Sequence, residues 1–254
     1  MDRIVGRSGR ILAILLVIGV GGVPAEDMRA VIDWSSWDRL LRNHVVNGFV
    51  DYNGLRSDPA FSETVNAIAE ADLSGAGESY RLAFLINAYN VLAIQGILDG
   101  RSPRTAIGKL NFFYRTKFTV AGERMSLNSL EHDLIRPLGE PRIHFAIVCA
   151  SASCPPLRSE AYVPARLDTQ LADNARVFLN DTTKNRFDVE RGVAELSKIF
   201  KWFSEDFGGD QQAVQRSIAA WVEDSEVSQR LTFGGFKIRY LDYDWSLNGS
   251  LETH

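Results

Sequence analysis

The segment of residues 82–98 contains no charged side chain, and it constrains the fold more than any other part of the chain. Its apolar residues cover most sides of a helix, but Asn87, Asn90 and Gln95 interrupt them. A membrane-spanning helix needs about 20 predominantly apolar residues, which this segment does not supply. We therefore predict that residues 78–98 form a helix buried at the centre of a globular core.

The two asparagines of this helix set a further requirement. A buried amide without a hydrogen-bond partner costs roughly 1 to 3 kcal/mol, so Asn87 and Asn90 must each bond to a specific group. Either they bind carbonyls of neighbouring loops, or they orient a residue of a binding site. Both alternatives remain open from the sequence, and both asparagines are candidate binding residues.

The remaining segments alternate between helical and strand-like patterns. The apolar spacing predicts further helices over residues 32–46, 59–70, 168–180, 198–207 and 211–223, with a short one from Asn128 to Pro137. Strands are expected as a hairpin over residues 117–127 and at residues 142–150, 187–194 and 236–241. Without repeats or linkers, this mixture predicts an α+β fold: one mainly helical domain around a small sheet, spanning residues 26–254.

The first 25 residues have the pattern of an export signal. Three arginines precede an uncharged run over residues 11–23, and Val23-Pro24-Ala25 supplies the small residues that signal peptidase requires. A 13-residue run rises only about 20 Å as a helix, against a hydrocarbon core of about 30 Å. We therefore expect residues 1–25 to be a cleaved signal peptide, leaving a periplasmic or secreted protein without stable membrane insertion.

Charge excludes one class of partner. The whole chain has a net charge of −4, and removal of three arginines and one aspartate with the signal peptide makes it −6. An acidic protein of this kind is not expected to bind nucleic acid. No glycine-rich phosphate loop, dinucleotide-binding fingerprint or zincin motif is present, so no cofactor is expected.

Most of the side chains able to react near neutral pH lie close together in the sequence. Two of the four histidines, His132 and His144, fall within 22 residues of both cysteines. A thiol nucleophile needs an imidazole to hold its thiolate, and that imidazole needs an orienting group. We predict Cys149 as the nucleophile, His132 or His144 as the base, and Glu131 either as the orienting carboxylate or as a capping-box partner of Asn128.

The polar loop after residues 142–150 completes the candidate site. Ser151, Ser153 and Cys154 follow a segment expected to be a buried strand, which is where α+β proteins commonly place ligand contacts. In a regular strand His144 and Cys149 would point to opposite faces, so both histidines are kept as candidates. A zinc site at the histidines and cysteines is disfavoured because the C-x4-C spacing is a weak metal signal, and no metal is expected.

Six stretches carry a resemblance to a known family. They are Val46-Asn47-Gly48-Phe49-Val50-Asp51-Tyr52, Asn87-Ala88-Tyr89-Asn90, Ser129-Leu130-Glu131-His132, Arg142-Ile143-His144-Phe145-Ala146, Cys149-Ala150-Ser151 with Ser153-Cys154-Pro155-Pro156-Leu157-Arg158, and Tyr243-Asp244-Trp245-Ser246-Leu247-Asn248. Through them the chain resembles the domain of unknown function family 547, whose members occur in exported bacterial proteins and in plant proteins. The resemblance implies no particular activity. A relation to papain-like enzymes would require a rearranged site, because both histidines precede Cys149.

Two functional hypotheses follow. The first is an exported thiol-dependent hydrolase or acyl-transfer enzyme, acting on a small molecule or a peptide, in which a neighbouring imidazole lowers the pKa of Cys149. The alternative is a non-enzymatic periplasmic binding or scaffold protein with a Cys149–Cys154 disulfide, since an oxidising compartment favours pairing. Free thiols in the folded, unreduced protein distinguish the first hypothesis from the second.

Export gives the first testable prediction. The mature protein should begin at Glu26 and should be recovered in an extracytoplasmic fraction, which N-terminal sequencing of the fractionated protein measures. A soluble cytoplasmic protein that begins at Met1 or Asp2 would contradict it.

Overall fold

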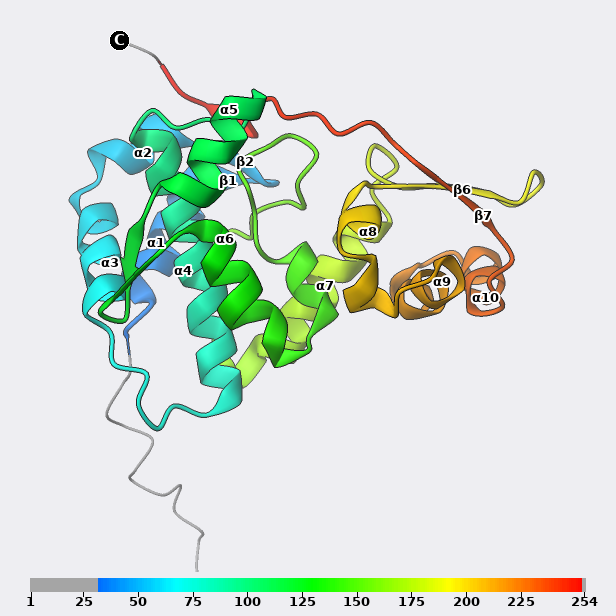
Figure 1. Ribbon diagram of the computed structural model, residues 1–254, viewed down its shortest axis with the longest axis horizontal. Coiled ribbons are helices and arrows are strands. Elements are labelled where there is room, and N and C mark those ends of the chain that lie inside the picture. The colour runs from blue at the N-terminus through cyan, green and yellow to red at the C-terminus, as the bar shows by residue number, and fades with distance from the viewer. Residues whose placement is uncertain (1–31, 253–254) are drawn as a thin grey trace, which may run out of the picture.

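The computed structural model describes residues 32–252 and shows helices packed around one central helix, with a second group of elements on one side (Figure 1). The predicted signal peptide, residues 1–25, lies outside the described residues. The α+β, mainly helical fold class is confirmed. The strands of the described chain form three small sheets rather than one.

Helix α4 (Glu78–Leu98) is the central helix, and the sequence predicted its bounds correctly. It is the one described helix that is long and apolar enough to cross a membrane, but 83% of its most apolar window is buried inside the protein. Every residue from Leu82 to Ile94 is buried. The helix is therefore the centre of the hydrophobic core, as its lack of charge predicted.

The N-terminal helices cover α4 on one side. They are α1 (Ser35–His44), α2 (Tyr52–Ser57) and α3 (Pro59–Glu70). Helix α3 begins where the sequence predicts, because Pro59 fits the first helical position and the Asp58 side chain accepts the Ala60 N–H at 3.0 Å. Trp37, Leu40 and Leu41 form the buried face of α1.

A hairpin and a run of short helices follow α4 in the chain. They are α5 (Ala106–Lys109), a π-helix (Leu110–Arg115), β3 (Phe118–Val120), β4 (Glu123–Met125), α6 (Leu127–Ser129), a π-helix (Leu130–Ile135), and 3-10 helices Arg136–Leu138, Pro141–Phe145 and Pro164–Arg166. The hairpin turns at Ala121-Gly122, as expected. Helix α6 is capped by Ser126, whose hydroxyl accepts the Ser129 N–H, so the predicted capping box at Asn128 and Glu131 is wrong.

A second hydrophobic cluster forms beyond helix α7 (Leu167–Leu179), around Phe145, Phe178 and Phe200. Its elements are β5 (Arg186–Asp188), β6 (Val193–Leu196), α8 (Ile199–Trp202), 3-10 helices Ser204–Phe207 and Ala219–Trp221, α9 (Gln211–Ile218), α10 (Ser225–Thr232) and β7 (Lys237–Tyr240). Strand β6 pairs antiparallel with β5 and parallel with β7. The sequence missed α2 and α10, and it merged β5 and β6 into one strand.

The predicted strand at residues 142–150 is wrong. Pro141–Phe145 forms a 3-10 helix instead, started by the Glu140 carboxylate, which accepts the Arg142 N–H at 2.9 Å. The backbone that follows is buried but pairs with none of the described strands, because side-chain amides of Asn90 and Asn174 satisfy its polar groups. An apolar, β-branched run indicated burial correctly, but burial alone does not make a strand.

The C-terminal segment runs back across the molecule from β7 to β8 (Gly249–Ser250), which pairs with β2 (Phe49–Asp51) beside β1 (Val45–Val46) (Figure 1). On its way it lies against the cysteine loop. The Ala152 N–H donates to the Ser246 carbonyl at 2.7 Å, and the Asn248 N–H donates to the Ala150 carbonyl at 3.2 Å. The end of the chain therefore forms one wall of the region around the cysteines.

The β1–β2 turn gives a prediction about this loop. Gly48 has a φ of +80°, and a Cβ there would lie 2.6 Å from the Cβ of Pro156. Gly122 has a similar φ of +81°, but a Cβ there would meet no atom of residues 32–252 within 4 Å. Gly48→Ala and Gly122→Ala both place an alanine in the left-handed region, which costs about 1 kcal/mol. Gly48→Ala should lower the free energy of unfolding by about 2 kcal/mol more than Gly122→Ala, because its Cβ clashes with Pro156. Urea unfolding measures it, and equal losses would contradict the close contact.

Candidate active site

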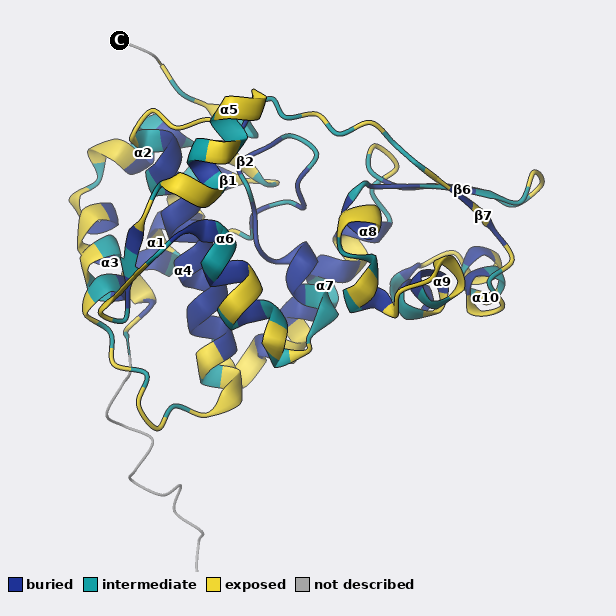
Figure 2. Cartoon of the chain, viewed as in Figure 1, coloured by how far each residue is buried: buried dark blue, intermediate teal, exposed yellow. Residues whose placement is uncertain are grey.

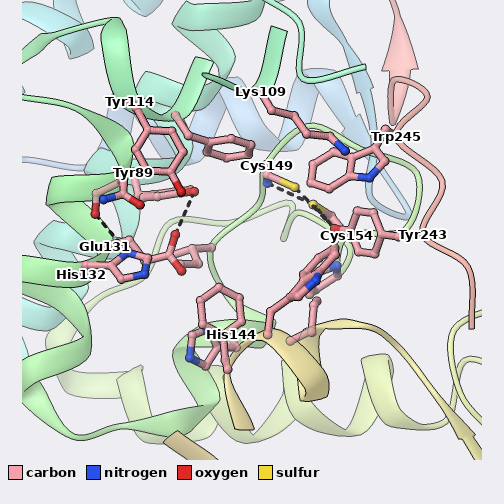
Figure 3. Close-up of a pocket in the computed structure, with 17 residues that line it drawn as sticks. Tyr89, Lys109, Tyr114, Glu131, His132, His144, Cys149, Cys154, Tyr243 and Trp245 are labelled. Carbon is pink, nitrogen blue, oxygen red and sulfur yellow. Dashed lines mark hydrogen bonds between the residues drawn. The ribbon is translucent and has the colours of Figure 1, made fainter. Parts of the chain in front are cut away.

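A cavity of about 440 Å³ opens between the α4 side of the molecule and the second cluster, and both cysteines line it (Figure 3). Seven of its seventeen lining residues are Phe, Tyr or Trp. The lining residues are Tyr89, Lys109, Phe113, Tyr114, Asn128, Glu131, His132, His144, Ile147, Cys149, Cys154, Pro155, Ile199, Trp202, Phe203, Tyr243 and Trp245. All four residues predicted as catalytic, Cys149, His144, His132 and Glu131, therefore face one space.

The backbone beside Cys149 is held in an uncommon conformation. Ala150 has a φ of +61°, in the left-handed region that costs an L-residue about 1 kcal/mol or more. Its carbonyl accepts the Asn248 N–H, and Lys184 Nζ donates to the neighbouring Ala152 carbonyl at 2.7 Å. The turn that presents the thiols is thus fixed from both sides by distant parts of the chain.

Both cysteines are free thiols in the structure. Hydrogen-bond donors converge on the sulfur of Cys154: the Cys149 N–H lies 3.1 Å from it. The hydroxyls of Ser151 and Tyr243 lie 3.2 and 3.3 Å from the same sulfur. When Cys154 is a thiolate, both hydroxyls can turn their protons toward it, which stabilises the negative charge.

The two thiols consequently have different acidities. Burial raises the pKa of the Cys154 thiol, but hydrogen bonds from Cys149, Ser151 and Tyr243 outweigh this effect and lower the pKa to about 6. The hydrogen bond to Cys154 and burial raise the pKa of Cys149 well above its ordinary value. The predicted low pKa of Cys149 is therefore wrong, because its proton is shared with the sulfur that carries the charge. The structure favours Cys154 as the thiolate.

Glu131 is the second titratable group in the cavity. Burial is the main cause that raises the pKa of its carboxyl to about 7, and the Tyr89 hydroxyl, which donates to Oε2 at 3.3 Å, only partly opposes it. Glu131 therefore orients no imidazole by a hydrogen bond within the described chain, contrary to one of its two predicted roles. A carboxyl that titrates near neutral pH is suited to general acid and base catalysis.

His144 is held by a partner that the sequence did not reveal. Its Nε2 lies 2.6 Å from Asp206 Oδ2, and its ring stacks on Phe203 with centroids 4.0 Å apart. Burial is the main cause that lowers the pKa of His144. Burial also raises the pKa of Asp206, but hydrogen bonds from His144 and the two from Arg136, both 2.7 Å long, place it well below its usual value.

Neither predicted base reaches a thiol. In the part of the chain that the structure describes, no hydrogen bond joins a histidine to Cys149 or Cys154, and Figure 3 shows both imidazoles apart from the sulfurs. His132 is exposed, and its Nδ1 lies 3.2 Å from the Asn128 carbonyl. No group of three or more potential ligands in residues 32–252 could hold a metal ion.

The two asparagines of α4 have different partners. Asn87 donates to the Tyr162 carbonyl at 2.8 Å and accepts the Tyr162 N–H at 3.0 Å, away from the thiols. Asn90 donates to the Ala146 carbonyl at 3.0 Å and accepts the Val148 N–H at 2.8 Å. Asn87 thus bonds a loop carbonyl, whereas Asn90 fixes the backbone that leads into Cys149.

The loop residues predicted to bind ligand fall into two groups. Ser151 is buried and contacts both sulfurs, at 3.3 Å from Cys149 and 3.2 Å from Cys154. Ser153 instead accepts the Asp244 N–H at 2.9 Å and so anchors the C-terminal segment. Of the loop residues predicted to bind ligand, Ser151 and Cys154 lie at the pair of thiols, and Ser153 does not.

Sequence reasoning missed several residues of the site. The rings of Tyr243, Trp202 and Trp245 pack at tilted angles, with centroids 4.6 to 5.8 Å apart, and Lys109 Nζ lies 3.8 Å from the centroid of the Trp245 ring. Tyr243 and Trp245 belong to a stretch that carried the family resemblance, which was the available signal. Asp206 lies 62 residues after His144, and no local pattern pointed to it.

Comparison with known families agrees with the resemblance. Residues 73–179 match the family described as protein of unknown function, DUF547. This central part of the chain is therefore similar to that family. The matched region contains Glu131, both histidines and both cysteines, but it ends before Asp206 and Tyr243. No curated protein and no solved structure matched the chain.

The asparagines give a matched pair of variants. Asn87→Leu and Asn90→Leu each remove two buried hydrogen bonds and should each lower the free energy of unfolding by about 2 to 4 kcal/mol. Only Asn90→Leu should also change the rate at which iodoacetamide alkylates Cys154, because only Asn90 fixes the backbone before Cys149. Equal effects of the two variants on alkylation would contradict this distinction.

Glu131 gives a prediction about pH. Because its pKa rises from about 4.5 to about 7 on folding, the stability that the protonated carboxyl provides is complete below pH 4.5 and is lost as pH rises through 7. Glu131→Gln should therefore leave stability unchanged at pH 4 and raise it at pH 8 by up to about 3 kcal/mol. Urea unfolding at the two pH values measures this, with the exposed Glu63→Gln as control. A pH-independent difference would contradict the raised pKa.

Proposed function

We propose that this protein is an exported thiol-dependent hydrolase or acyl-transfer enzyme, with Cys154 as the nucleophile. The observation that carries the proposal is the convergence of donors from Cys149, Ser151 and Tyr243 on the Cys154 sulfur, which lines the 440 Å³ cavity. A buried sulfur surrounded by donors is stabilised as a thiolate, the nucleophilic form. For this reason the proposed nucleophile is Cys154 and not Cys149, which the sequence predicted.

The chemistry requires a proton donor as well as a nucleophile, and Glu131 is suited to that role. Hydrogen bonds lower the pKa of Cys154 and burial raises the pKa of Glu131, so the two shifts together favour a thiolate beside a protonated carboxyl near neutral pH. The Cys154 thiolate attacks the carbonyl carbon of an ester, thioester or amide, and the C=O electron pair moves onto oxygen. The adduct then collapses as the leaving group departs with the Glu131 proton.

The second half of the reaction releases the thiol. Water or another nucleophile attacks the Cys154 thioester, gives its proton to the Glu131 carboxylate, and expels the thiolate. Ser151 and Tyr243 turn their hydroxyl protons back to the sulfur as its charge returns. Hydrolysis and acyl transfer differ only in the second nucleophile.

The alternative is a binding or scaffold protein that uses the aromatic cavity without catalysis. The absence of a histidine–thiol hydrogen bond among the described residues is the observation that favours it, whereas the free thiols do not support the disulfide it invoked. The two hypotheses differ in the pKa of Cys154: the enzyme requires a lowered value, whereas the binding or scaffold protein does not.

Alkylation tests the proposal. Iodoacetamide labelling of the unreduced protein against pH, followed by fragmentation of the tryptic peptide of residues 143–158, reports each thiol separately. Cys154 should label with a midpoint near pH 6 and Cys149 only at much higher pH. Tyr243→Phe should raise the Cys154 midpoint by about one unit, because it removes a hydrogen bond to the thiolate, and Tyr240→Phe should not.

Activity provides the second readout. Cys154→Ser should reduce hydrolysis of aryl esters and acyl thioesters by at least about a thousandfold, whereas Cys149→Ser should cost much less. A Cys154 midpoint near 8.5 that Tyr243→Phe leaves unchanged, or the absence of free thiols, would contradict the proposal and favour the binding or scaffold protein.

A further inference from the structure

One segment of this acidic protein has the opposite charge. Residues 100–122 contain Arg101, Arg104, Lys109, Arg115 and Lys117 and no acidic residue, although the whole chain has a net charge of −4. None of the five cations forms an ion pair within residues 32–252. After the hydrogen bonds of Ser246, the charge of Arg104 helps to lower the pKa of Asp244, so this one carboxylate offsets part of the charge.

The same segment exposes apolar side chains. Ile107, Leu110 and Tyr114 are 71%, 40% and 53% exposed, and they recur at three- and four-residue spacing along α5 and the π-helix that follows. That spacing places them on one side of a helical segment. Figure 2 shows part of α5 in the colour of exposed residues and none of it in the colour of buried residues. Exposed apolar side chains flanked by cations are typical of segments that lie in a membrane interface.

A small hollow at the end of this segment is lined by cationic and neutral polar side chains. It has a volume of about 340 Å³ and is lined by Arg101, Asn111, Arg115, Thr116 and Lys117. Three cations, an amide and a hydroxyl, without a carboxylate, are the donor set that a phosphate group requires. A nucleic acid would use the same cations but would gain nothing from Ile107 and Leu110, so the apolar side chains favour a lipid.

We propose that residues 101–117 dock the protein on an anionic phospholipid bilayer. The headgroup phosphate lies in the hollow between Arg101, Arg115 and Lys117, and Ile107, Leu110 and Tyr114 enter the interface. Lys109 and Tyr114 also line the catalytic cavity, so docking brings the mouth of that cavity to the lipid surface (Figure 3). This is peripheral binding, distinct from insertion, and it does not depend on the thiol chemistry.

A fluorophore at the docking face tests the proposal in the full chain. Ile107→Cys, in a Cys149→Ser/Cys154→Ser background, is labelled with an environment-sensitive dye and mixed with vesicles of equal parts phosphatidylglycerol and phosphatidylcholine. We expect a blue shift of the emission, and none with phosphatidylcholine alone. Phe233→Cys is the matched control, because Phe233 is 77% exposed on the C-terminal side of α10 and should show no shift.

Charge variants complete the experiment. Arg101→Gln and Arg115→Gln should each weaken co-sedimentation of the otherwise unchanged chain with the anionic vesicles about fivefold, whereas Arg216→Gln on α9 should not. Inorganic phosphate should compete no better than sulfate at equal ionic strength, since the bilayer and not free phosphate is the ligand. No shift at position 107, an equal shift on neutral vesicles, or tighter binding to single-stranded RNA than to vesicles would each overturn the proposal. Because these assays need no nucleophile, they can fail while thiol labelling succeeds, and the reverse.

Discussion

The arrangement of the backbone around the cysteines depends on the hydrogen bonds of the buried Asn90 side-chain amide. It bonds the Ala146 carbonyl and the Val148 N–H, and so gives a non-strand backbone the partners that a sheet would otherwise supply. Helix α4 is buried on nearly all sides, so this amide cannot exchange its partners for water. The position of Cys149, and through its N–H the environment of Cys154, follows from that constraint.

The second determinant comes from the far end of the chain. The segment between β7 and β8 bonds to both sides of the Ala150 turn and brings the Tyr243 hydroxyl to the thiols. The lowered pKa of Cys154 thus depends on helix α4, from the middle of the sequence, and on the segment between β7 and β8, near its end. The family match covers only residues 73–179, so the matched region contains the thiols but not Tyr243. A fragment limited to residues 73–179 would therefore lack one of the hydrogen-bond donors to the Cys154 sulfur.

The two carboxyl groups at the site, those of Asp206 and Glu131, lie in different surroundings. Asp206 binds His144 and Arg136 at one side of the cavity, while Glu131 is buried near Tyr89 and forms no ion pair with another described residue. One carboxylate is therefore kept ionised and the other titrates near neutral pH. This division of two acids by their surroundings lets the proposed mechanism use a carboxyl, not an imidazole, as the proton donor.

The sequence by itself determined α4, α3, the hairpin at Ala121-Gly122 and the set of reactive residues, because an uncharged helix, a capped proline and a turn are local patterns. It also placed the cysteines and Glu131 in one candidate site, because these residues lie close together in the sequence. Only the tertiary structure decided that residues 142–150 form no strand, that Cys154 and not Cys149 carries the lower pKa, and that Asp206 holds His144. These outcomes depend on contacts across 50 to 100 residues, such as Asn90 with Val148 and Cys154 with Tyr243, whose formation local periodicity does not encode.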